Sequence, residues 1–235
     1  MRARLPLLLL IVMLSTPAAG QSSALPTDST RTERSVLSAL GRGGQVVLTN
    51  SGFGLGGFVS GQLGSVTAWS LEASIGAVKD EREVAFFDRF GRRDVPNKAN
   101  FLVEIPLQFG FERRVFSSRI EADFRPFLSA SAGPVLGWLY PYFDDENENE
   151  AYDEGEPTHD VISGLPHGTL RLAWHGNLSF GARFGSAHRP GYGVRFGYRY
   201  TRYASDIALL EPSIKTPTRR FVSPVVTVFF GRMGH

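Results

Sequence analysis

Apolar and polar side chains alternate with a period of two over long stretches of the chain. Between Phe101 and Phe111 every odd position is apolar, whereas Glu104 and Gln108 are among the even positions. Because successive side chains of a β-strand point to opposite faces of the sheet, this alternation predicts a strand with one purely apolar face.

The same alternation recurs along the chain and predicts eight strands. The fifth and sixth are separated at His175 by the sequence HGN, which we interpret as a tight hairpin turn. Weaker candidates at 45–49 and 206–210 leave a barrel of ten strands as the alternative. The eight expected strands are 53–62, 66–77, 101–111, 120–140, 169–175, 178–185, 192–203 and 221–230.

These strands predict an all-β fold, a closed antiparallel up-and-down β-barrel that is transmembrane. The segments have about the 9 to 11 residues that a tilted strand needs to cross hydrocarbon. Aromatic side chains such as Trp138 and Tyr198 gather near strand ends, as in the interfacial girdles of membrane barrels. A soluble secreted barrel or sandwich is the alternative. Prolines inside the expected strands would each remove a ladder hydrogen bond: Pro106, Pro126 and Pro134.

The first twenty residues have the pattern of a secretory signal peptide. Arg2 and Arg4 precede a short apolar run, and small residues precede Gln21. The run is shorter than the about 20 residues that a membrane-spanning helix requires. We expect a cleaved signal at 1–20, a tether or plug at 21–44 and the barrel at 45–235.

The charge balance gives no indication of a nucleic-acid partner. Without the two arginines of the signal, 25 − 2 = 23 basic residues stand against 23 acidic ones. The sequence pI of 9.0 is therefore no argument for nucleic-acid binding. The chain has no cysteine, so its stability does not rest on disulfides.

Four segments resemble the small outer-membrane β-barrel proteins of Gram-negative bacteria, the group around outer-membrane proteins A and X. They are RPFLSASAGPVLGW (125–138), LAWHGNLSFGARFG (172–185), VRFGYRYTRY (194–203) and SPVVTVFF (223–230). The resemblance implies an outer-membrane location, with membrane lipids, lipopolysaccharide and the barrel-assembly machinery as partners. Gly231 to His235 follow the terminal aromatic residue, on which such barrels usually end.

An eight-stranded barrel has an interior that its own side chains fill. Because an unpaired charge in a dry interior is costly, we expect a network of ion pairs that closes the lumen. A selective channel or a catalytic cluster is the alternative. The residues expected to point inward are Glu72, Glu104, Asp123, Arg125, Arg171, Arg183, Arg195 and Arg199.

The acidic stretch 141–157 has oxygen ligands at the spacing of an EF-hand-type calcium loop. It departs from that pattern at the sixth position, where Glu150 replaces the glycine of the sharp turn, and in lacking flanking helices. A hydrated acidic loop is the alternative. The candidate Ca²⁺ ligands are Asp145, Asn147, Asn149, the Ala151 carbonyl, Asp153 and Glu156.

No catalytic constellation is evident. Ser186 and His188 are two residues apart on an expected loop, which does not suit a nucleophile and its base. The glycine-rich segment 52–58 is not a phosphate loop, because no Lys-Ser/Thr follows it. We expect a non-enzymatic protein with a structural, adhesive or ligand-binding role; a lipid-modifying enzyme and a small transport channel are the alternatives.

The long connections 78–99 and 141–167 are expected to carry the interactions of the barrel, and the mixed-charge segment 79–94 is a candidate partner-binding loop. In the eight-strand count they follow the second and fourth strands. They would then lie at the same end as the chain termini, whereas bacterial barrels place long loops at the opposite end.

Overall fold

The computed structural model describes residues 40–84, 86–87, 93–116, 124–145, 147, 149, 151–153, 156–185 and 190–232. Eight long strands form a closed antiparallel barrel in the order β1-β10-β9-β8-β7-β6-β3-β2. Two short strands, β4 (Phe86–Phe87) and β5 (Arg93–Asp94), pair outside it, and the 3₁₀ helix η1 spans Leu165–His167. The barrel strands are β1 (Gly41–Thr49), β2 (Gly52–Gln62), β3 (Thr67–Val78), β6 (Asn100–Arg114), β7 (Phe124–Pro141), β8 (Thr169–Phe184), β9 (Gly191–Ile207) and β10 (Thr218–Arg232).

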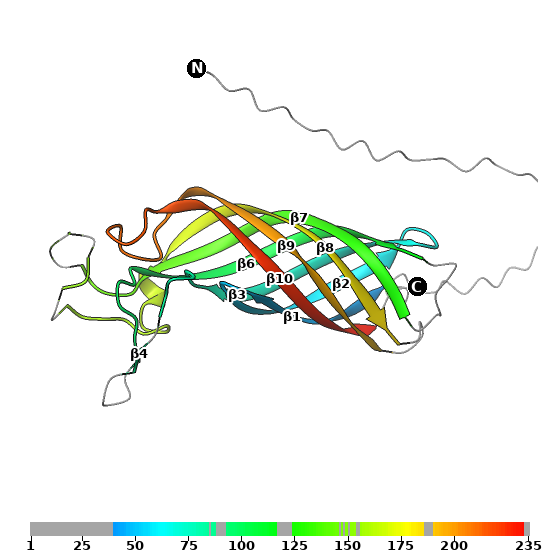
Figure 1. The fold of residues 1–235 in the computed structure, drawn as a ribbon, viewed down its shortest axis with the longest axis horizontal. Coiled ribbons are helices and arrows are strands. Elements are labelled where there is room, and N and C mark those ends of the chain that lie inside the picture. The colour runs from blue at the N-terminus through cyan, green and yellow to red at the C-terminus, as the bar shows by residue number, and fades with distance from the viewer. Residues whose placement is uncertain are drawn as a thin grey trace, which may run out of the picture. The chain divides into compact units, whose positions relative to one another are not determined.

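The barrel closes between its first and last strands, which lie side by side in Figure 1. Arg42 pairs with Arg232 and Thr49 pairs with Val225, so the start of β1 and the end of β10 are at the same end of the barrel. The structure thus confirms the closed eight-stranded up-and-down barrel that the sequence predicts. β1 begins at Gly41, four residues before the expected start of the barrel.

Two of the expected strands are one continuous strand, so the predicted hairpin at His175 is wrong. β8 runs without interruption from Thr169 to Phe184, and His175 is 2% exposed, on its inner face. The even positions stay on the outer face on both sides of Gly176, because the alternation does not change phase there. The strand count remains eight because 45–49, a weaker candidate in the sequence, belongs to β1. Asp206 lies within β9 and begins no additional strand.

This assignment also corrects the expected position of the long connections. The connections after β1, β3, β7 and β9 are at the end opposite to the start of β1 and the end of β10. Figure 1 shows the connections after β3, β7 and β9 together at that end, which we call the loop end. We call the other the terminus end; it carries the connections after β2, β6 and β8.

The prolines do not break the barrel. The β6–β7 pairing has the same register on both sides of Pro134, with Pro106 opposite Val135 and Phe109 opposite Ala132. The β6–β7 ladder is interrupted at Pro134 and Gly133, and the β3–β6 ladder is interrupted at Pro106 and Ile105; proline has no N–H to donate. The register is the same on both sides of each interruption, so the wall tolerates these prolines without a register shift.

The outer surface of the wall is apolar on every strand. The exposed large apolar side chains that point outward from the strands are between 37% and 70% exposed. Representative residues, one from each strand, are Leu48, Phe53, Leu71, Phe109, Leu128, Trp174, Tyr198 and Val222. Among the residues that the structure describes, no helix is long and apolar enough to cross a membrane.

The interior has an apolar cluster towards each end and polar side chains between them. Phe58, Phe127 and Phe229 form the cluster towards the terminus end. The cluster towards the loop end contains Leu102, Val135, Leu139, Ala173, Tyr203, Ile207 and Leu209. The charged layer between them is thus shielded from water on both sides.

Candidate functional site

The central contact of the interior is a buried ion pair between β3 and β9. The guanidinium of Arg195 donates two hydrogen bonds to Glu72, one of them at 2.8 Å to Oε1, and a third at 3.3 Å to Gln45 of β1. Glu72 also accepts a 3.0 Å bond from Ser70. Since Glu72 is 4% exposed and Arg195 9%, this pair joins opposite parts of the wall in a water-poor environment.

A second ion pair lies towards the terminus end. Arg183 of β8 contacts Glu112 of β6 through Nε (2.8 Å) and Nη2 (2.6 Å), which is a bidentate arrangement. Its guanidinium also lies 5.0 Å from the ring centre of Phe229 and 5.5 Å from that of Phe127. Arg183 thus connects the charged layer to the aromatic cluster below it.

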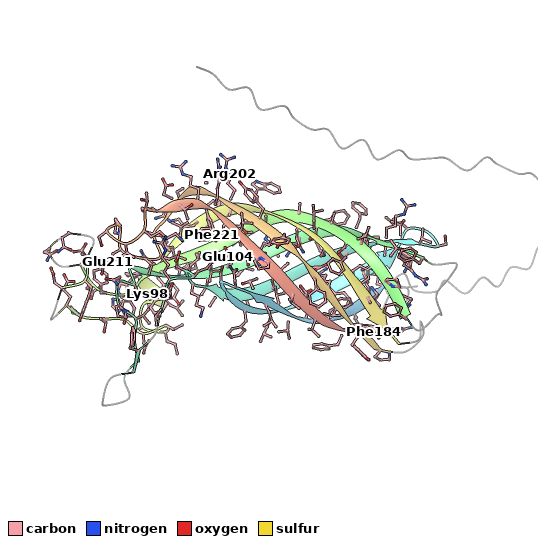
Figure 2. The ribbon with its side chains drawn as sticks, in the orientation of Figure 1. Lys98, Glu104, Phe184, Arg202, Glu211 and Phe221 are labelled. Carbon is pink, nitrogen blue, oxygen red and sulfur yellow. The ribbon has the colours of Figure 1, made fainter. Side chains whose placement is uncertain are left out.

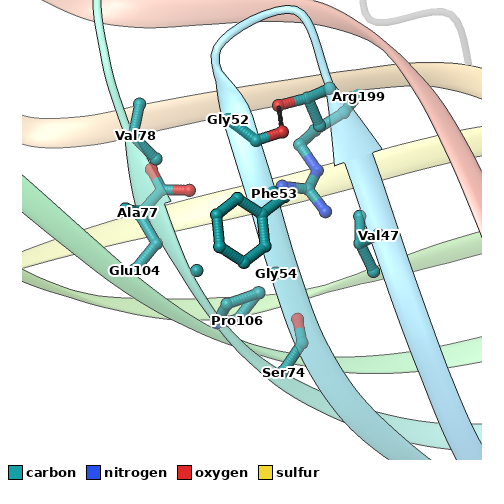
Figure 3. A pocket seen from close by; sticks show the side chains of 12 residues that line it. Val47, Gly52, Phe53, Gly54, Ser74, Ala77, Val78, Glu104, Pro106 and Arg199 are labelled. Atoms are coloured by element: carbon teal, nitrogen blue, oxygen red, sulfur yellow. Dashed lines mark hydrogen bonds between the residues drawn. The ribbon is translucent and has the colours of Figure 1, made fainter.

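A third polar contact lies towards the loop end. The hydroxyl of Tyr203, 1% exposed, donates to the carboxylate of Glu104, 5% exposed. Figure 3 shows Glu104 and Arg199 at opposite sides of a small cavity between them. This cavity of about 20 Å³ has room for about one water molecule. A second cavity of about 20 Å³ lies beside Arg195 and Glu112.

His175 and Asn177 extend the polar layer along β8. His175 is 2% exposed and Asn177 8%, and both are on the inner face. Within the described residues, neither ring nitrogen of His175 has a hydrogen-bond partner, and the Oδ1 atom of Asn177 has none either. The sequence interpretation missed both because it placed them in a turn.

Most of the predicted interior residues are where the alternation puts them. Asp123 lies outside the described residues. Glu112 was missed because the expected strand ended at Phe111, although β6 continues in phase to Arg114. Gln45 was missed because its segment was only a weaker strand candidate. The residues on the inner face as predicted are Glu72, Glu104, Arg125, Arg171, Arg183, Arg195 and Arg199.

The connections at the loop end fold together into a compact layer that we call the cap. Lys98 and Glu83 form a 2.6 Å ion pair with both side chains 4% exposed. Lys215 forms an ion pair with Asp80, and Glu211 accepts a 3.2 Å bond from the backbone of Tyr152. Figure 2 shows Lys98 and Glu211 at this end of the molecule.

Backbone hydrogen bonds connect the three long connections within the cap. Ala99 and Asn100 donate to the carbonyl of Leu209 at 3.0 and 3.3 Å, and Tyr142 donates to that of Ala99 at 2.9 Å. Leu209 itself belongs to the apolar cluster at the loop end of the interior. The cap therefore packs onto the barrel and covers this end of its interior. In the candidate partner-binding segment 79–94, the side chain of Phe86 is 58% exposed.

The acidic connection brings several of its candidate calcium ligands close together. The side-chain amides of Asn147 and Asn149 donate to Asp153 at 2.6 and 2.9 Å, and the backbone of Asn149 donates to Asp145 at 3.1 Å. The backbone of Asp153 donates to Glu156 at 3.0 Å. Ala151 lies in the same connection, and its N–H donates to the Asn149 side chain at 2.8 Å.

No group of three acidic or histidine side chains in the described part of the chain has the arrangement of a metal site. The side-chain oxygens of the acidic connection accept hydrogen bonds from within the connection. A bound Ca²⁺ would therefore have to replace several of these bonds. Calcium binding stays a prediction.

One histidine pair lies at the edge of the cap. His159 Nε2 is 2.8 Å from Asp144 Oδ1, and the His159 ring stacks on that of His167 with 5.1 Å between centres. The hydroxyl of Ser163 is directed to the Asp160 carbonyl at 3.5 Å and, within the described residues, has no contact with His159. Ser186 and His188 lie outside the described residues.

The comparisons with known proteins returned no match. No family model matches the chain. No curated protein and no solved structure shows significant similarity to it.

Proposed function

We propose that the chain is an integral outer-membrane β-barrel protein of the small-barrel type, with a closed, charge-filled interior. In this proposal the barrel is a membrane anchor, and the cap at the loop end is the surface that adheres to or binds a partner. The observation that carries the proposal is the apolar outer wall.

The outer wall is too apolar for a surface that faces water. Soluble monomers rarely expose a continuous apolar patch of more than a few hundred Å². Here Trp174, Leu178 and Tyr198 are each 68–70% exposed on neighbouring strands, and every other barrel strand also has an exposed apolar side chain. Acyl chains are the environment that such a surface fits.

Outward-pointing arginines bound this apolar surface at both ends. On β10 every outward residue between Arg220 and Arg232 is apolar, from Val222 to Phe230. The twelve steps of about 3.4 Å from Arg220 to Arg232, at a tilt of about 40°, correspond to about 30 Å along the barrel axis between the two arginines. This height matches the hydrocarbon core of a bilayer, which is about 30 Å thick.

The filled interior supports an anchor rather than a pore. The two interior cavities beside the ion pairs have about 20 Å³ each, which is room for about one water molecule. Leu209 and the aromatic cluster of Phe58, Phe127 and Phe229 cover the two ends. A conductance close to that of the bare bilayer is expected in planar membranes, and stable open steps would favour the channel alternative.

The position of the long connections supports an exposed binding surface. In bacterial barrels both termini are periplasmic and the long loops are extracellular. The connections after β3 and β7 are at the loop end, opposite to the termini of the barrel. The cap would then meet the surroundings of the cell, and its acidic connection would be the calcium-binding part of that surface.

Detergent dependence tests the membrane part of the proposal. We expect the mature protein to aggregate in plain buffer and to become monodisperse in a neutral detergent. On a gel the unheated, folded barrel should migrate differently from the boiled chain. A mature protein that stays monodisperse without detergent would refute the proposal.

Cysteine labelling tests which end of the barrel faces the cell exterior. Because the chain has no native cysteine, only the introduced cysteine can react. Ile162 is 76% exposed at the loop end, and a Cβ added to Gly64 at the terminus end meets no atom within 4 Å. In intact cells a membrane-impermeant maleimide should label Ile162→Cys and spare Gly64→Cys. Both variants should react after lysis. The reverse pattern would place the cap in the periplasm and remove its proposed role.

The proposal assigns no catalytic activity to the chain. A lipid-modifying enzyme would need a nucleophile beside a base such as His159. Incubating the reconstituted barrel with a phospholipid and following the release of fatty acid tests this alternative. Release that is lost in His159→Ala would establish the enzyme in place of the anchor.

A further inference from the structure

The outer wall contains an apolar groove of about 660 Å³ that crosses β6, β7, β8 and β9 and reaches Val222 of β10. Its volume is in the range of about 300–1,000 Å³ that is typical of small-molecule sites. Ala130, Ala132 and Gly176 are the small residues on its outer face, and Phe109 and Tyr200 are among the large residues beside them. A Cβ added to Gly176 would meet no atom within 4 Å, so the space above this glycine is open.

Two arginines stand next to the loop-end side of this groove. Arg202 of β9 and Arg220 of β10 are directly paired across the two strands, and both point outward. Figure 2 shows Arg202 directed away from the barrel. The next outward residues towards the terminus end are Tyr200 and Val222, which line the groove.

Within the described residues, the arginine pair has no counter-charge. Like charges that face each other across two strands are destabilising. Neither Arg202 nor Arg220 has an ion-pair partner within the described part of the chain, and Asp206 is engaged by Arg219 at 2.9 Å. The neighbour of Arg202 on β8 is Trp174, which carries no charge. An anion between the two guanidinium groups would remove the repulsion.

We propose that the groove and the arginine pair together bind one lipid with a phosphorylated headgroup. The inference rests on the membrane location proposed above. The phosphate accepts hydrogen bonds from Arg202 and Arg220, and an acyl chain fills the groove above Gly176. A lipid supplies both parts in the required order, because its headgroup is at the membrane surface and its chains extend into the core.

Other occupants fit less well. An apolar peptide or helix would leave the arginines without a counter-charge. A second barrel packed groove to groove would bring further arginines to the site. Arg42 and Arg232 form a similar pair at the terminus end, but they do not line the groove. Of these two arginine pairs, Arg202 and Arg220 at the loop end are the pair that lies next to the groove.

Trp174 makes the site measurable, because it is 68% exposed on the outer wall beside Arg202. The other two tryptophans, Trp69 and Trp138, are replaced by phenylalanine, and the full mature barrel is reconstituted in vesicles. Bilayers of phosphatidylcholine receive small fractions of phosphatidic acid with brominated acyl chains, or the same fractions of brominated phosphatidylcholine. Bromine quenches tryptophan fluorescence at contact. The ratio of the two quenching curves gives the preference for the phosphomonoester headgroup.

We expect phosphatidic acid to be preferred by more than tenfold at Trp174. Arg202→Gln and Arg220→Gln should each lower the preference about fivefold, which is the usual effect of one basic residue beside an anionic lipid. Gly176→Phe should lower it as well by filling the groove. The matched controls are Arg232→Gln at the terminus end and Ala73→Phe at an outward position of β3, and neither should change it.

The failures are distinguishable. A barrel that does not insert into vesicles would refute the membrane location and the lipid site together. A barrel that inserts but is quenched equally by both lipids would refute the lipid site alone. Loss of the preference in millimolar inorganic phosphate would show an anion site with no need for the groove. Quenching that falls as the protein-to-lipid ratio rises would show a second barrel in the groove.

Discussion

Replacing Arg195 by leucine tests whether ion pairs hold the barrel interior together. The change removes the cation from a pair in which Glu72 is 4% exposed. An unpaired buried carboxylate is costly, and breaking a buried pair in this way typically destabilises a protein by about 3–5 kcal/mol. Gln45 is a neutral group and does not replace the lost charge. We therefore expect Arg195→Leu to lower the free energy of unfolding by about 3–5 kcal/mol.

The measurement is urea unfolding of the mature barrel in lipid vesicles, followed by tryptophan fluorescence. The control is Arg219→Leu, because Arg219 and Asp206 form a pair whose side chains are 52% and 53% exposed. An exposed pair contributes about 0–1 kcal/mol. The double variant Glu72→Leu/Arg195→Leu removes both charges and should recover most of the lost stability. The single variant Glu72→Leu completes the comparison. If Arg195→Leu costs no more than Arg219→Leu, or if the costs of Glu72→Leu and Arg195→Leu simply add in the double variant, the interior pair has no structural role.

Three further outcomes are expected. Tyr203→Phe removes the hydroxyl that donates to Glu104 and should lower the free energy of unfolding by about 1–3 kcal/mol, measured in the same urea assay. Calcium titration calorimetry should give a Kd on the order of 10⁻⁴ to 10⁻³ M that is lost in Asp153→Ala; no heat at millimolar calcium would leave a plain acidic loop. The backbone N–H groups of Ser163 and Ile162 hold the pKa of Asp160 below its usual range. The hydrogen bonds of Asp160 therefore stabilise its turn above a pH of about 4, and this stabilisation is lost as the pH falls through the folded pKa of Asp160. Acid should then make the turn of the native chain sensitive to cleavage by pepsin. In Asp160→Asn, acid should change the rate of cleavage little.

The sequence predicted which side of the wall a residue faces much better than where each strand ends. The alternation alone placed Glu72 and Arg195 on the inner face. A shift of one residue in the phase of a strand would turn all of its side chains to the opposite face, so the phase is strongly specified. Their pairing depends on how far each strand is staggered along its neighbours, which alternation does not encode. The sequence HGN at His175 has the composition of a turn, yet the alternation continues through it in phase. Continuity of phase was the better indicator, and it would also have extended β6 to Glu112.

The cap could not be predicted in the same way. Its contacts join segments without alternation, such as the pairing of Lys98 with Glu83 and the backbone bonds around Leu209. Such contacts depend on three connections arriving at one end of the barrel. That arrangement in turn depends on the strand count and on which segment is the first strand. Leaving out 45–49 as the first strand therefore moved both long connections to the wrong end, and the extra strand from the split at HGN kept the count at eight.

Arginines in three environments of this barrel have three different physical roles. Arg195 is buried and paired, so its removal leaves a charge without compensation and should cost stability. Arg219 is half exposed and paired, and water screens most of its interaction with Asp206. Arg202 and Arg220 are outward and, within the described residues, without a counter-charge, so the folded chain gains nothing from placing them opposite each other. Replacing them should leave stability in a neutral detergent unchanged or slightly higher and should weaken only the contact with anionic lipid. A loss of stability in neutral detergent as large as that of Arg195→Leu would assign this pair to the fold rather than to a ligand.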